Sequence, residues 1–447
     1  MYINCADDCG NSTDLIIILF LYNNLMDKFF YIIFIKLYPV VARLLSPFNE
    51  KARFWLNGRK NIFQQIETAV AGDTSKKIWM HCASLGEFEQ GRPLLEKFKE
   101  TYPTHKTVLT FFSPSGYEVL KDKKPADYVF YLPIDSSQNA QKFLDLINPS
   151  LITFVKYEYW YYYLKEAHAR KIPLLLVSGI FFPTFSFFKW YAKTRREMLR
   201  FFTHFFVQTA NSKQLLQSIN INNVSISGDT RFDRVLQVAA ELRSFPEIEK
   251  FINNTKTIIA GSTWTDDDEA LDHFANTHQE LKFIIAPHDI NKERLKECCT
   301  LYKYSILYSS YVSMVNKNEA IHENTNTLII DNIGMLKFLY RYATICHVGG
   351  GFGNDGIHNI LEAAVYYKPV VFGPAFENFS EAIELIDKGG AFDVEDAIEL
   401  EDQLEELLSD ERLYKEAANI AGDYVKNNTG ATNAIMNYIQ GNRLLTN

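Results

Sequence analysis

The sequence predicts an α/β protein made of two doubly wound halves. Short apolar runs with the composition of strands alternate with helical segments along most of the chain, which is typical of parallel strands connected by helices. The alternation pauses near residues 228–245 and then starts again. With 447 residues, the chain is long enough for two domains of ordinary size, each with its own core.

Each expected strand is followed by a helical or turn segment. The strands of the first half cover residues 78–82, 107–112, 128–132, 151–155, 173–178, 205–208 and 224–227. Those of the second half cover 257–260, 283–286, 327–330, 343–348 and 369–373, before a tail of acidic helices. In open α/β sheets, ligands bind beyond the carboxyl ends of the strands, so the loops that follow the strands are the expected binding positions.

The composition excludes several classes of protein. Hydrophobic residues make up 47% and charged residues 22%, which indicates a folded globular chain. The net charge of -8 argues against a nucleic-acid binder, which is normally basic. The six cysteines and ten histidines show no metal-ligand spacing, so we expect free thiols in a reducing compartment and no metal.

The N-terminal region is apolar and basic. Residues 15–22 and 29–45 are apolar, but polar and charged residues interrupt the region, and neither segment is a clean membrane span of about 20 residues. Between residues 28 and 60, seven basic residues accompany one acid, which is typical of a helix lying on an anionic membrane face. A helix that covers a domain, with its charges in water, is the alternative. The true start, Met1 or Met26, stays open.

Residues 181–206 combine aromatic rings with cations. Seven rings lie between residues 181 and 191, ahead of Lys193, Arg195, Arg196 and Arg200. Core packing explains part of this density, but a surface that takes a lipid tail beside a phosphorylated head group needs both kinds of residue. We therefore expect a lipid-binding surface in this stretch.

A glycine-rich loop dominates the second half. Residues 349–356 contain five glycines, after an apolar strand and before a helix that we expect to start near Ile357. This layout presents backbone N–H groups and a helix N-terminus to a phosphate. The spacing fits neither the GxxxxGK[ST] loop nor the GxGxxG dinucleotide pattern. Further loops at 261–263, 287–288 and 373–380 also follow strands, so together they predict a nucleotide site.

Three carboxylates are candidates for chemistry. Glu362 comes one turn after His358, where it suits the ribose hydroxyls, or it is a capping or solvated glutamate. Glu87 follows a strand and Gly86 in the first half, where it could take a proton from an attacking hydroxyl. Alternatively, it is a first-turn acid favoured by the helix dipole. Glu158 is similarly placed after a strand.

Several motifs together carry a family resemblance. They are Ser84-x-Gly86-Glu87, Gly261-Ser262-Thr263, the loop at 348–353, His358-Asn359-x-x-Glu362 and Gly373-Pro374 with Asn378-Phe379-x-Glu381. In this order they resemble the 3-deoxy-D-manno-octulosonic acid (Kdo) transferases of Gram-negative lipid A assembly. The resemblance extends from residue 28 to residue 440.

The resemblance implies a GT-B glycosyltransferase with two Rossmann-like domains facing across a cleft. It implies an N-terminal extension with a membrane-associated, anchoring helix at 1–46, an acceptor domain at 47–235 and a donor domain at 236–447. The donor would be CMP-Kdo and the acceptor the lipid A precursor, lipid IVA, at the cytoplasmic face of the cell inner membrane. The reaction would be inverting, without metal or cofactor, and part of lipopolysaccharide core biosynthesis.

The resemblance also implies roles for individual residues. Glu87 matches the catalytic base, which would deprotonate the 6′-hydroxyl of the acceptor sugar as CMP leaves. The residues expected to bind the donor are Ser262, Thr263, Pro287, His288, Gly349, Gly350, Gly351, Gly353, His358, Asn359 and Glu362. The residues expected to bind the acceptor are Ser84, Gly86, Glu158, Lys193, Arg195 and Arg196.

Three positions depart from the family pattern. They are Lys156 in place of an acid, Pro287-His288-Asp289 in place of Pro-Arg-His, and Gly356-Ile357 in place of paired glycines before His358. The missing arginine leaves more of the phosphate contact to the backbone. The alternative enzyme is another GT-B transferase or an epimerase that uses a UDP-sugar, and the non-enzymatic alternative is a membrane-bound scaffold. The number of Kdo units, the phosphorylation of the acceptor and the oligomeric state stay open.

Overall fold

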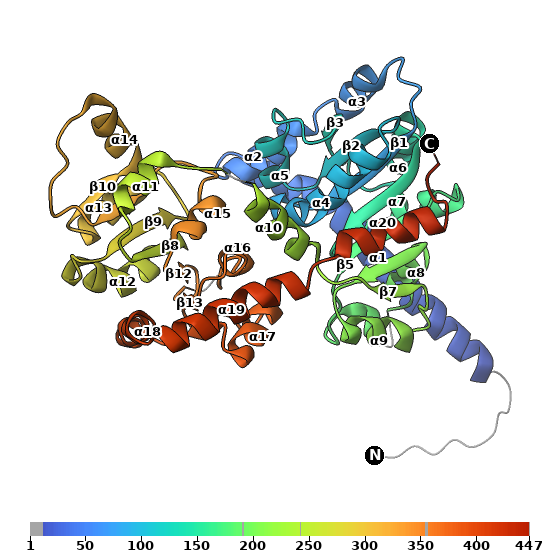
Figure 1. Cartoon of the computed structure of the whole chain (residues 1–447). Helices are drawn as coiled ribbons and strands as arrows, with labels where there is room; N and C mark the ends of the chain where they lie inside the picture. Colours follow the sequence, from blue (N-terminus) through green and yellow to red (C-terminus); the bar gives the residue numbers. More distant parts are fainter. Residues whose placement is uncertain (1–11, 190–191, 242, 354–355, 447) are drawn as a thin grey trace, which may run out of the picture. The chain divides into compact units, whose positions relative to one another are not determined.

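The computed structural model describes residues 12–189, 192–241, 243–353 and 356–446, with the side chains from residue 29 onward except those of 193 and 194. The chain divides into two compact units (Figure 1). Unit 1 comprises Met1–Thr230 and Gly430–Asn447, and unit 2 comprises Arg231–Thr429. Each unit contains a seven-stranded parallel sheet, which confirms the predicted doubly wound class.

The sheet of unit 1 has the strand order β3-β2-β1-β4-β5-β6-β7. Its strands are β1 (Lys77–Cys82), β2 (Lys106–Phe111), β3 (Tyr128–Tyr131), β4 (Pro149–Val155), β5 (Leu174–Gly179), β6 (His204–Val207) and β7 (Val224–Ile226). β1 pairs in parallel with β2 and β4, so that Ile78 lies opposite Thr107 and Leu151. All residues of β1 and β5 are buried, because helices cover both faces of the sheet.

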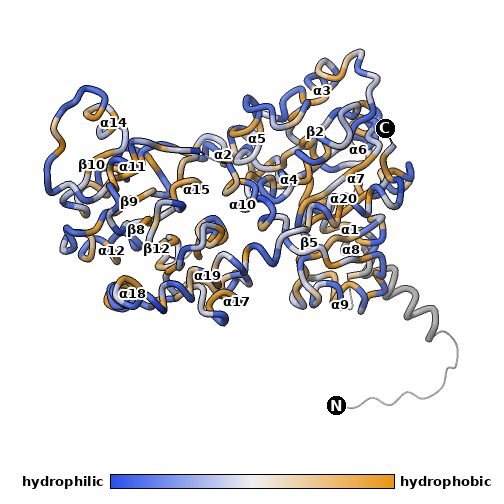
Figure 2. Tube along the Cα trace, viewed as in Figure 1, coloured by the Kyte–Doolittle hydropathy of each residue, from blue (hydrophilic) through white to orange (hydrophobic). Residues whose placement is uncertain are grey.

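Two apolar clusters fill the space between this sheet and its helices. The connecting helices are α4 (Leu85–Thr101), α5 (Pro114–Leu120), α6 (Ser137–Ile147), α7 (Tyr161–Ala169), η1 (Ser186–Phe188), α8 (Lys193–Arg200) and α9 (Ala210–Ser218). Trp79 of β1 lies in one cluster, and its neighbours Ile78 and Met80 lie in the other, as alternation along a strand requires. Hydrophobic residues concentrate in the strands, and hydrophilic residues concentrate in the loops (Figure 2).

Three helices precede the sheet: α1 (Ser12–Leu45), α2 (Glu50–Gly58) and α3 (Ile62–Val70). α1 joins the two apolar segments of the sequence into one helix of 34 residues. The Tyr31 hydroxyl of α1 donates to Asp135, whose carboxylate also accepts the backbone N–H groups of Tyr162 and Tyr163 at the start of α7. This shared carboxylate fastens α1 to unit 1. No helix in the described part of the chain has the length and apolarity to cross a membrane.

The sheet of unit 2 has the strand order β10-β11-β9-β8-β12-β13-β14. Its strands are β8 (Thr257–Thr263), β9 (Lys282–Pro287), β10 (Ser305–Leu307), β11 (Thr327–Ile329), β12 (Ile345–Val348), β13 (Val370–Phe372) and β14 (Ala391–Asp393). Its helices are α10 (Thr230–Ala240), α11 (Pro246–Ile252), α12 (Thr265–Thr277), α13 (Lys292–Leu301), α14 (Tyr308–Lys317), α15 (Leu336–Leu339), η2 (Tyr340–Tyr342), α16 (Leu361–Ala364), α17 (Ser380–Lys388), α18 (Ala397–Ser409) and α19 (Glu411–Asn427). Every expected strand of both halves is present, whereas the short edge strands β10 and β14 were not expected.

The last helix, α20 (Ala431–Gly441), packs in unit 1 although the preceding chain belongs to unit 2. Its residues Ile435 and Ile439 join the apolar cluster around α4. The sequence instead predicted one domain at 236–447. The periodicity of a helix reveals an apolar stripe but does not reveal which sheet the stripe covers, and this explains the difference.

In both sheets the first strand of the unit lies between two later ones. β1 has β2 on one side and β4 on the other, and β8 lies between β9 and β12. Connections from the central strand therefore leave in opposite directions, and an open sheet binds its ligand beyond the strand ends at this switch point. We therefore expect the ligands to bind at the loops after β1, β2 and β4 in unit 1, and at those after β8, β9 and β12 in unit 2.

Candidate active site

Glu87 lies one turn into α4, shortly after the central strand of unit 1. Ser84 is the N-cap of this helix, and the Glu87 oxygen Oε2 accepts both the Ser84 hydroxyl and, at 3.0 Å, the Ser84 backbone N–H. This capping box satisfies backbone donors at the start of the helix. The structural role of Glu87 engages one oxygen, and the described residues offer no hydrogen bond to the other, Oε1. The carboxylate is therefore both fixed in place and open on one side.

Gly86 leaves space beside this carboxylate. It is exposed, and a Cβ at this position would come no closer than 3.7 Å to any neighbouring atom, namely Ser84 Oγ. The fold therefore does not require glycine here. A glycine nevertheless keeps the approach to the Glu87 carboxylate open for another molecule.

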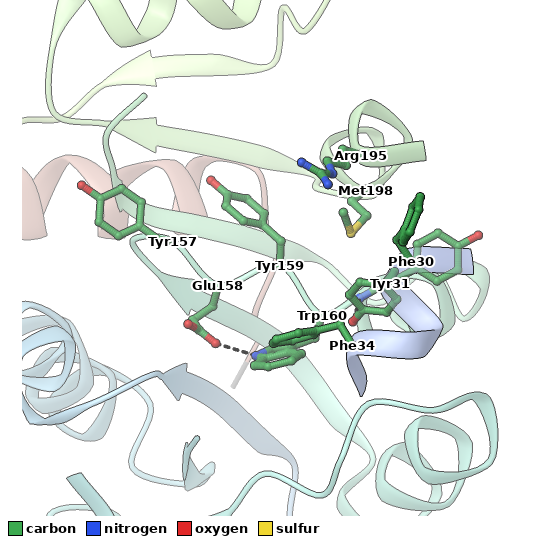
Figure 3. A pocket seen from close by; sticks show the side chains of 10 residues that line it. Phe30, Tyr31, Phe34, Tyr157, Glu158, Tyr159, Trp160, Arg195 and Met198 are labelled. Atoms are coloured by element: carbon green, nitrogen blue, oxygen red, sulfur yellow. Dashed lines mark hydrogen bonds between the residues drawn. The ribbon is translucent and has the colours of Figure 1, made fainter. Parts of the chain in front are cut away.

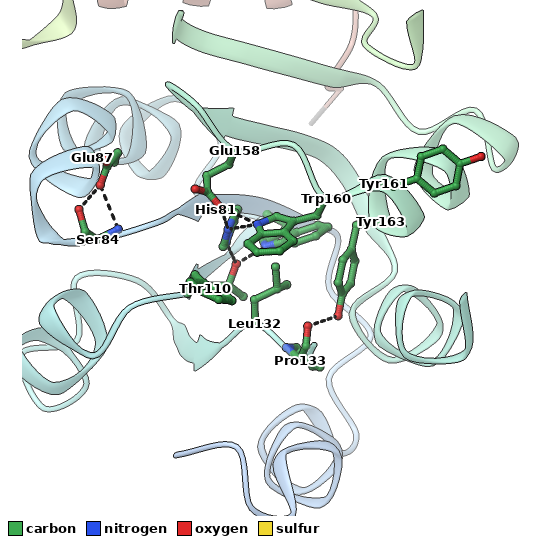
Figure 4. Close-up of polar contacts among 12 residues, drawn as sticks. His81, Ser84, Glu87, Thr110, Leu132, Pro133, Glu158, Trp160, Tyr161 and Tyr163 are labelled. Atoms are coloured by element: carbon green, nitrogen blue, oxygen red, sulfur yellow. Dashed lines mark hydrogen bonds and ion pairs between the residues drawn. The ribbon is translucent and has the colours of Figure 1, made fainter. Parts of the chain in front are cut away.

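A second carboxylate, Glu158, belongs to a chain of hydrogen bonds after β4 (Figure 4). Its oxygen Oε2 accepts the indole N–H of Trp160 at 2.5 Å and lies 3.1 Å from His81 Nε2. On the other side of the imidazole, Nδ1 is 2.8 Å from the Thr110 hydroxyl, which also accepts the indole N–H of Trp79. When Thr110 donates its single proton to Nδ1, the His81 proton sits on Nε2 and faces Glu158.

Sequence reasoning identified Glu158 but missed His81 and Thr110. These two residues are fully buried and pair directly across β1 and β2. The available signal was a histidine in an otherwise apolar strand, because a buried polar side chain needs a partner. Burial, followed by the charges of Glu87 and Glu158, raises the pKa of the Cys82 thiol, so both carboxylates lie near the end of β1.

Lys156 makes the turn that carries Glu158 away from the sheet. Its φ of 67° is left-handed, and its backbone N–H donates to Val177 O at 2.9 Å. A side chain in this conformation costs about 1 kcal/mol, which the surrounding sheet must offset. The Lys156 ammonium lies 5.2 Å from the centre of the Tyr157 ring. The lysine that departs from the family pattern therefore has a backbone role in shaping this loop.

A cavity of about 500 Å³ opens beside the turn after β4 (Figure 3). Phe30 and Phe34 of α1 and Met198 of α8 contribute apolar walls, and Glu158 and Arg195 contribute opposite charges. The structure therefore brings two of the expected acceptor residues to one cavity. Its wall from α1 was not foreseen, because residues more than a hundred positions apart meet here.

The other expected acceptor residues lie elsewhere. Arg196 donates from its guanidinium to two backbone carbonyls in and beside η1, both at 2.8 Å, so it stabilises that segment. Ser84 and Gly86 precede Glu87 in the chain and do not line the cavity. The side chain of Lys193 lies outside the described residues, as do Trp190 and Tyr191 of the aromatic run.

The glycine-rich loop of unit 2 is held largely by its own backbone. The Gly349 N–H donates to Gly261 O at 2.9 Å, and the His358 N–H donates back to Gly349 O at 3.0 Å. Gly350, with a φ of 94°, donates to the fully buried carboxylate of Asp267 at 2.8 Å. These three N–H groups therefore shape the loop and are not available to a phosphate in this arrangement.

Asp267 was missed by sequence reasoning. The same oxygen that accepts the Gly350 N–H also accepts the Trp264 N–H at 2.8 Å, so one carboxylate ties the glycine loop to the start of α12. The loop also lies in close contact with the segment after β13, because a Cβ on Gly351 would lie 2.5 Å from Gly373 N. Glycine is required at this contact because two backbones meet there.

The prediction of a helix that starts directly behind the loop is wrong. It was predicted to start near Ile357, but α16 covers only Leu361–Ala364. The Ile357 N–H donates to Ala375 O at 3.1 Å and its side chain is buried, so this residue is held in the core and not in a helix. Asn359 caps the short turn and donates to Glu362 Oε1 at 3.4 Å. A one-turn helix has little dipole, so the expected positive helix end is absent here.

Three aromatic rings stack where the loops after β8, β9 and β12 meet. The ring centres of Trp264 and His288 are 4.4 Å apart, and those of His288 and His358 are 4.6 Å apart. Ser262 is left-handed with a φ of 57°, and Thr263 is fully buried at the end of β8. The structure thus brings His288 and His358 together as expected and adds Trp264, whose signal was its place directly after the Gly261-Ser262-Thr263 motif.

No group of three or more His, Cys, Asp or Glu side chains that could hold a metal ion is found within the described ranges. The family model described as 3-Deoxy-D-manno-octulosonic-acid transferase (kdotransferase) matches residues 57–234. The 3-deoxy-D-manno-octulosonic acid transferase of Aquifex aeolicus is 28% identical over 341 residues, which are 74% of this chain and 86% of that protein. The chain is therefore similar to the Kdo transferase family. This is a family of glycosyltransferases, and the matched region contains both Glu87 and Glu158.

A longer relative extends the similarity through unit 2. The bifunctional glycosyltransferase/methyltransferase of Fusobacterium nucleatum is 28% identical over 425 residues, which are 90% of this chain but 63% of that protein. The solved glycosyltransferase from Rickettsia africae has a TM-score of 0.54 at 16% identity and covers 84% of this chain and 100% of its own. At this identity it supports the fold alone, and that fold is GT-B.

Proposed function

We propose that the protein transfers Kdo from CMP-Kdo to the lipid A precursor lipid IVA, with inversion at the anomeric carbon and without a bound metal or cofactor. The supporting observation is the Glu87 carboxylate, which is fixed through one oxygen within the region matched by the family model. An inverting transfer needs a base on the acceptor side, because the hydroxyl attacks from the face opposite the leaving group.

The proposed reaction uses the two oxygens of Glu87 differently. The 6′-hydroxyl of the acceptor sugar attacks the anomeric carbon of Kdo, and Glu87 Oε1 removes the hydroxyl proton as the bond to the CMP phosphate breaks. Oε2 meanwhile stays on the N–H and hydroxyl of Ser84, which hold the base in position. Unit 2 receives the departing phosphate beside its glycine loop. Because the N–H groups of Gly349, Gly350 and His358 are engaged within the protein, the phosphate contacts come from other groups at this switch point.

The cavity beside Glu158 is the proposed site for part of the lipid acceptor. Its aromatic and aliphatic walls, with Phe30, Phe34 and Met198 among them, suit an acyl chain. The Arg195 guanidinium at the same cavity suits a phosphate on the acceptor. Ser84 and Gly86 then border the sugar that carries the attacking hydroxyl, which keeps the acceptor assignments within unit 1.

The exposed face of α1 supports a place at the membrane surface. Side chains such as Phe29, Phe34 and Leu37 are about half exposed, and Leu44 is 69% exposed. A contiguous apolar stripe of this kind, flanked by the basic residues between 28 and 60, suits the anionic cytoplasmic face of the inner membrane. The lipid acceptor would then reach the cavity without leaving the bilayer surface entirely.

Replacement of the proposed base is the direct test. We expect Glu87→Gln to lower product formation from CMP-Kdo and lipid IVA by at least about a thousandfold, since the amide cannot accept the proton. Mass spectrometry of the product measures the loss, and calorimetry checks that CMP still binds. The matched control is Glu89→Gln on the same helix, which removes a charge paired with Arg92 at the surface and should leave turnover near normal.

The outcomes separate the proposal from its alternative. Near-normal transfer by the Glu87→Gln variant would overturn the assignment of the base. Binding of UDP in preference to CMP, with turnover of a UDP-sugar, would instead favour the alternative GT-B transferase or epimerase. A product that carries Kdo on lipid IVA also shows, by its mass, how many units are added.

A further inference from the structure

The helix α1 is docked to unit 1 along one narrow side. Ile35 and Ala42 on this side are buried, whereas Phe34 and Leu37 are about half exposed. A helix docked along a single stripe depends on specific contacts for its position, because apolar packing alone is not directional. The contacts of α1 therefore decide where its side chains lie relative to the rest of the unit.

The cavity beside the turn after β4 has one wall from α1 and another from this turn. Phe30 and Phe34 form part of the first wall, and Glu158 and Trp160 form part of the second (Figure 3). An acyl chain suits the apolar first wall, and a sugar hydroxyl suits the carboxylate of the second. The two walls belong to segments that are far apart in the chain, so their spacing depends on a contact between these segments.

The Tyr31 hydroxyl joins the two walls. It donates to Asp135 and accepts the backbone N–H of Tyr161 at 3.1 Å. Tyr161 directly follows Trp160, whose indole N–H donates to Glu158 at 2.5 Å. Burial, followed by the charge of Asp135, raises the pKa of Tyr31, so the hydroxyl keeps its proton and stays a donor. One hydroxyl of α1 therefore fixes the chain next to the carboxylate.

The same contact completes the start of α7. The first N–H groups of a helix need acceptors from outside the helix. The first of them here, from Tyr161, goes to Tyr31. The next two, from Tyr162 and Tyr163, go to the buried carboxylate of Asp135 at 3.0 Å and 3.1 Å. The start of α7 is thus complete only while α1 stays in place, and the two segments are fixed together.

A second tyrosine, two turns further along α1, provides a comparison. The Tyr38 ring lies 5.3 Å from that of Phe112, which in turn lies 4.8 Å from the ring of Trp160. Within the described ranges the Tyr38 hydroxyl makes no hydrogen bond. Tyr38 therefore packs toward the second wall through its ring alone, whereas Tyr31 acts through its hydroxyl.

We propose that Tyr31 is a positioning residue for the acceptor: its hydroxyl holds the apolar wall of α1 and the Glu158 carboxylate at the spacing that one acylated sugar needs to contact both. The inference rests on the proposed function, which places the lipid acceptor in this cavity. An acceptor that contacts both walls gains from both only when they are already held in one arrangement, because any ordering on binding costs affinity. An acceptor without acyl chains contacts the second wall alone and does not depend on that arrangement.

Turnover of two acceptors by the full chain tests this role. One acceptor is lipid IVA, and the other is the same sugar phosphate with its acyl chains removed. Mass spectrometry of the products gives kcat/KM for each acceptor with CMP-Kdo, and the ratio of the two values reports how far the two walls act together. The variants are Tyr31→Phe, which removes only the hydroxyl, and Tyr38→Phe, which is the matched loss of a hydroxyl from the same helix. The donor is common to both acceptors, so its binding cancels in the ratio.

We expect Tyr31→Phe to lower the ratio of lipid IVA to deacylated acceptor by about tenfold, the size of one lost buried hydrogen bond. The KM of lipid IVA should rise while its kcat changes by less than about twofold, because acceptor binding and not the chemical step depends on the spacing. Tyr38→Phe should leave the ratio unchanged. A merely structural role of Tyr31 would lower both kcat/KM values by the same factor and would not move the ratio.

The proposal is overturned if Tyr31→Phe has the ratio of the unmodified protein, or if Tyr38→Phe lowers the ratio equally. In both cases the unmodified protein still uses lipid IVA, so the proposed function stands. If it uses lipid IVA but not the deacylated acceptor, the dissociation constants of the two acceptors from calorimetry replace the kcat/KM values, under the same criterion. If the unmodified protein uses neither acceptor, the proposed function fails and the role of Tyr31 fails with it.

Discussion

The candidate sites at the switch points of the two units differ in the chemical groups that form them. In unit 1 the site consists of side chains: Glu87 is capped by Ser84, and Glu158 ends a chain through His81 and Thr110. In unit 2 it consists mainly of glycine backbone and stacked rings. Proton removal needs a carboxylate fixed by hydrogen bonds, whereas an anionic leaving group needs positive edges and close approach. One kind of sheet thus supports both tasks through different loops.

The two units nevertheless share a backbone device. Lys156 at the end of β4 and Ser262 near the end of β8 are both left-handed residues that are not glycine. Each such residue costs about 1 kcal/mol and persists only where surrounding contacts fix it. Lys156 follows the end of β4, whereas Ser262 makes an irregularity within β8, after which Thr263 still pairs with Pro287.

The largest difference between the units should appear when a methyl group is added to one glycine of each unit. We expect Gly351→Ala to destabilise unit 2 by about 3 kcal/mol, because its Cβ would lie 2.5 Å from Gly373 N and neither backbone can move alone. CMP binding should be lost with it. Thermal unfolding and calorimetry measure the two effects.

Gly86→Ala is the matched change in unit 1. Its Cβ meets nothing closer than 3.7 Å, and alanine is a better helix former, so stability should change by less than about 1 kcal/mol. CMP binding should be unchanged. Equal destabilisation by the two substitutions would mean that the contrast between a backbone-built and a side-chain-built site is wrong.

A smaller effect should follow from truncating the hydrogen-bond chain of unit 1. Glu158→Ala removes the carboxylate that contacts both His81 Nε2 and the indole N–H of Trp160. Only the 3.1 Å contact between these two nitrogens remains, and His81 is fully buried. We expect a loss of about 2 kcal/mol in the free energy of unfolding, as for other buried donors left unsatisfied. Denaturant unfolding followed by tryptophan fluorescence measures it.

The control is Glu166→Ala on α7, which breaks a surface ion pair with Arg170. Such pairs contribute about 0.5 kcal/mol or less, so this variant should unfold almost like the original protein. If Glu158→Ala is equally mild, the His81 chain is not a stabilising element of the site, and the ordered side-chain network inferred for unit 1 would have to be abandoned.

The fold was accessible from sequence because its signals are local. Buried parallel strands are continuous apolar runs, so every expected strand was found. The edge strands β10 and β14 were missed, and their length does not explain it, because β7, β11 and β13 also have three residues each. The helix expected near Ile357 was lost to a long-range contact, the hydrogen bond from its N–H to Ala375. Local propensity cannot anticipate such a partner.

The candidate site was accessible only in part, for the same reason. Glu87 and the histidines stand next to strand ends, and that position alone indicates a ligand edge. Asp267 acts on Gly350, which is 83 positions away, and His81 acts with Thr110, which is 29 positions away. These pairs depend on which strands and loops become neighbours. Single sequence positions do not contain that information.

The smallest expected effect concerns acid and the C-terminal helix that closes unit 1. His204 of β6 stacks on Tyr438 of α20 at 4.1 Å, and its Nε2 lies 2.8 Å from Ser225 Oγ. Burial lowers the pKa of His204 from 6.5 to about 4. The His204 imidazole therefore gains a proton near pH 6.5 in the unfolded chain but only near pH 4 in the folded protein. The free energy of unfolding consequently decreases as the pH falls through this window.

After allowance for solvent screening, we expect this loss to be about 1 kcal/mol and to be confined to unit 1. Hydrogen exchange of residues 431–441 measures the opening of α20 at neutral pH and at about pH 4.5, inside the window set by the two pKa values. His204→Phe keeps the aromatic stack without the titrating group, so its α20 should exchange equally at both pH values. Acid opening of α20 that persists in His204→Phe would show that another group controls the contact between this helix and the sheet.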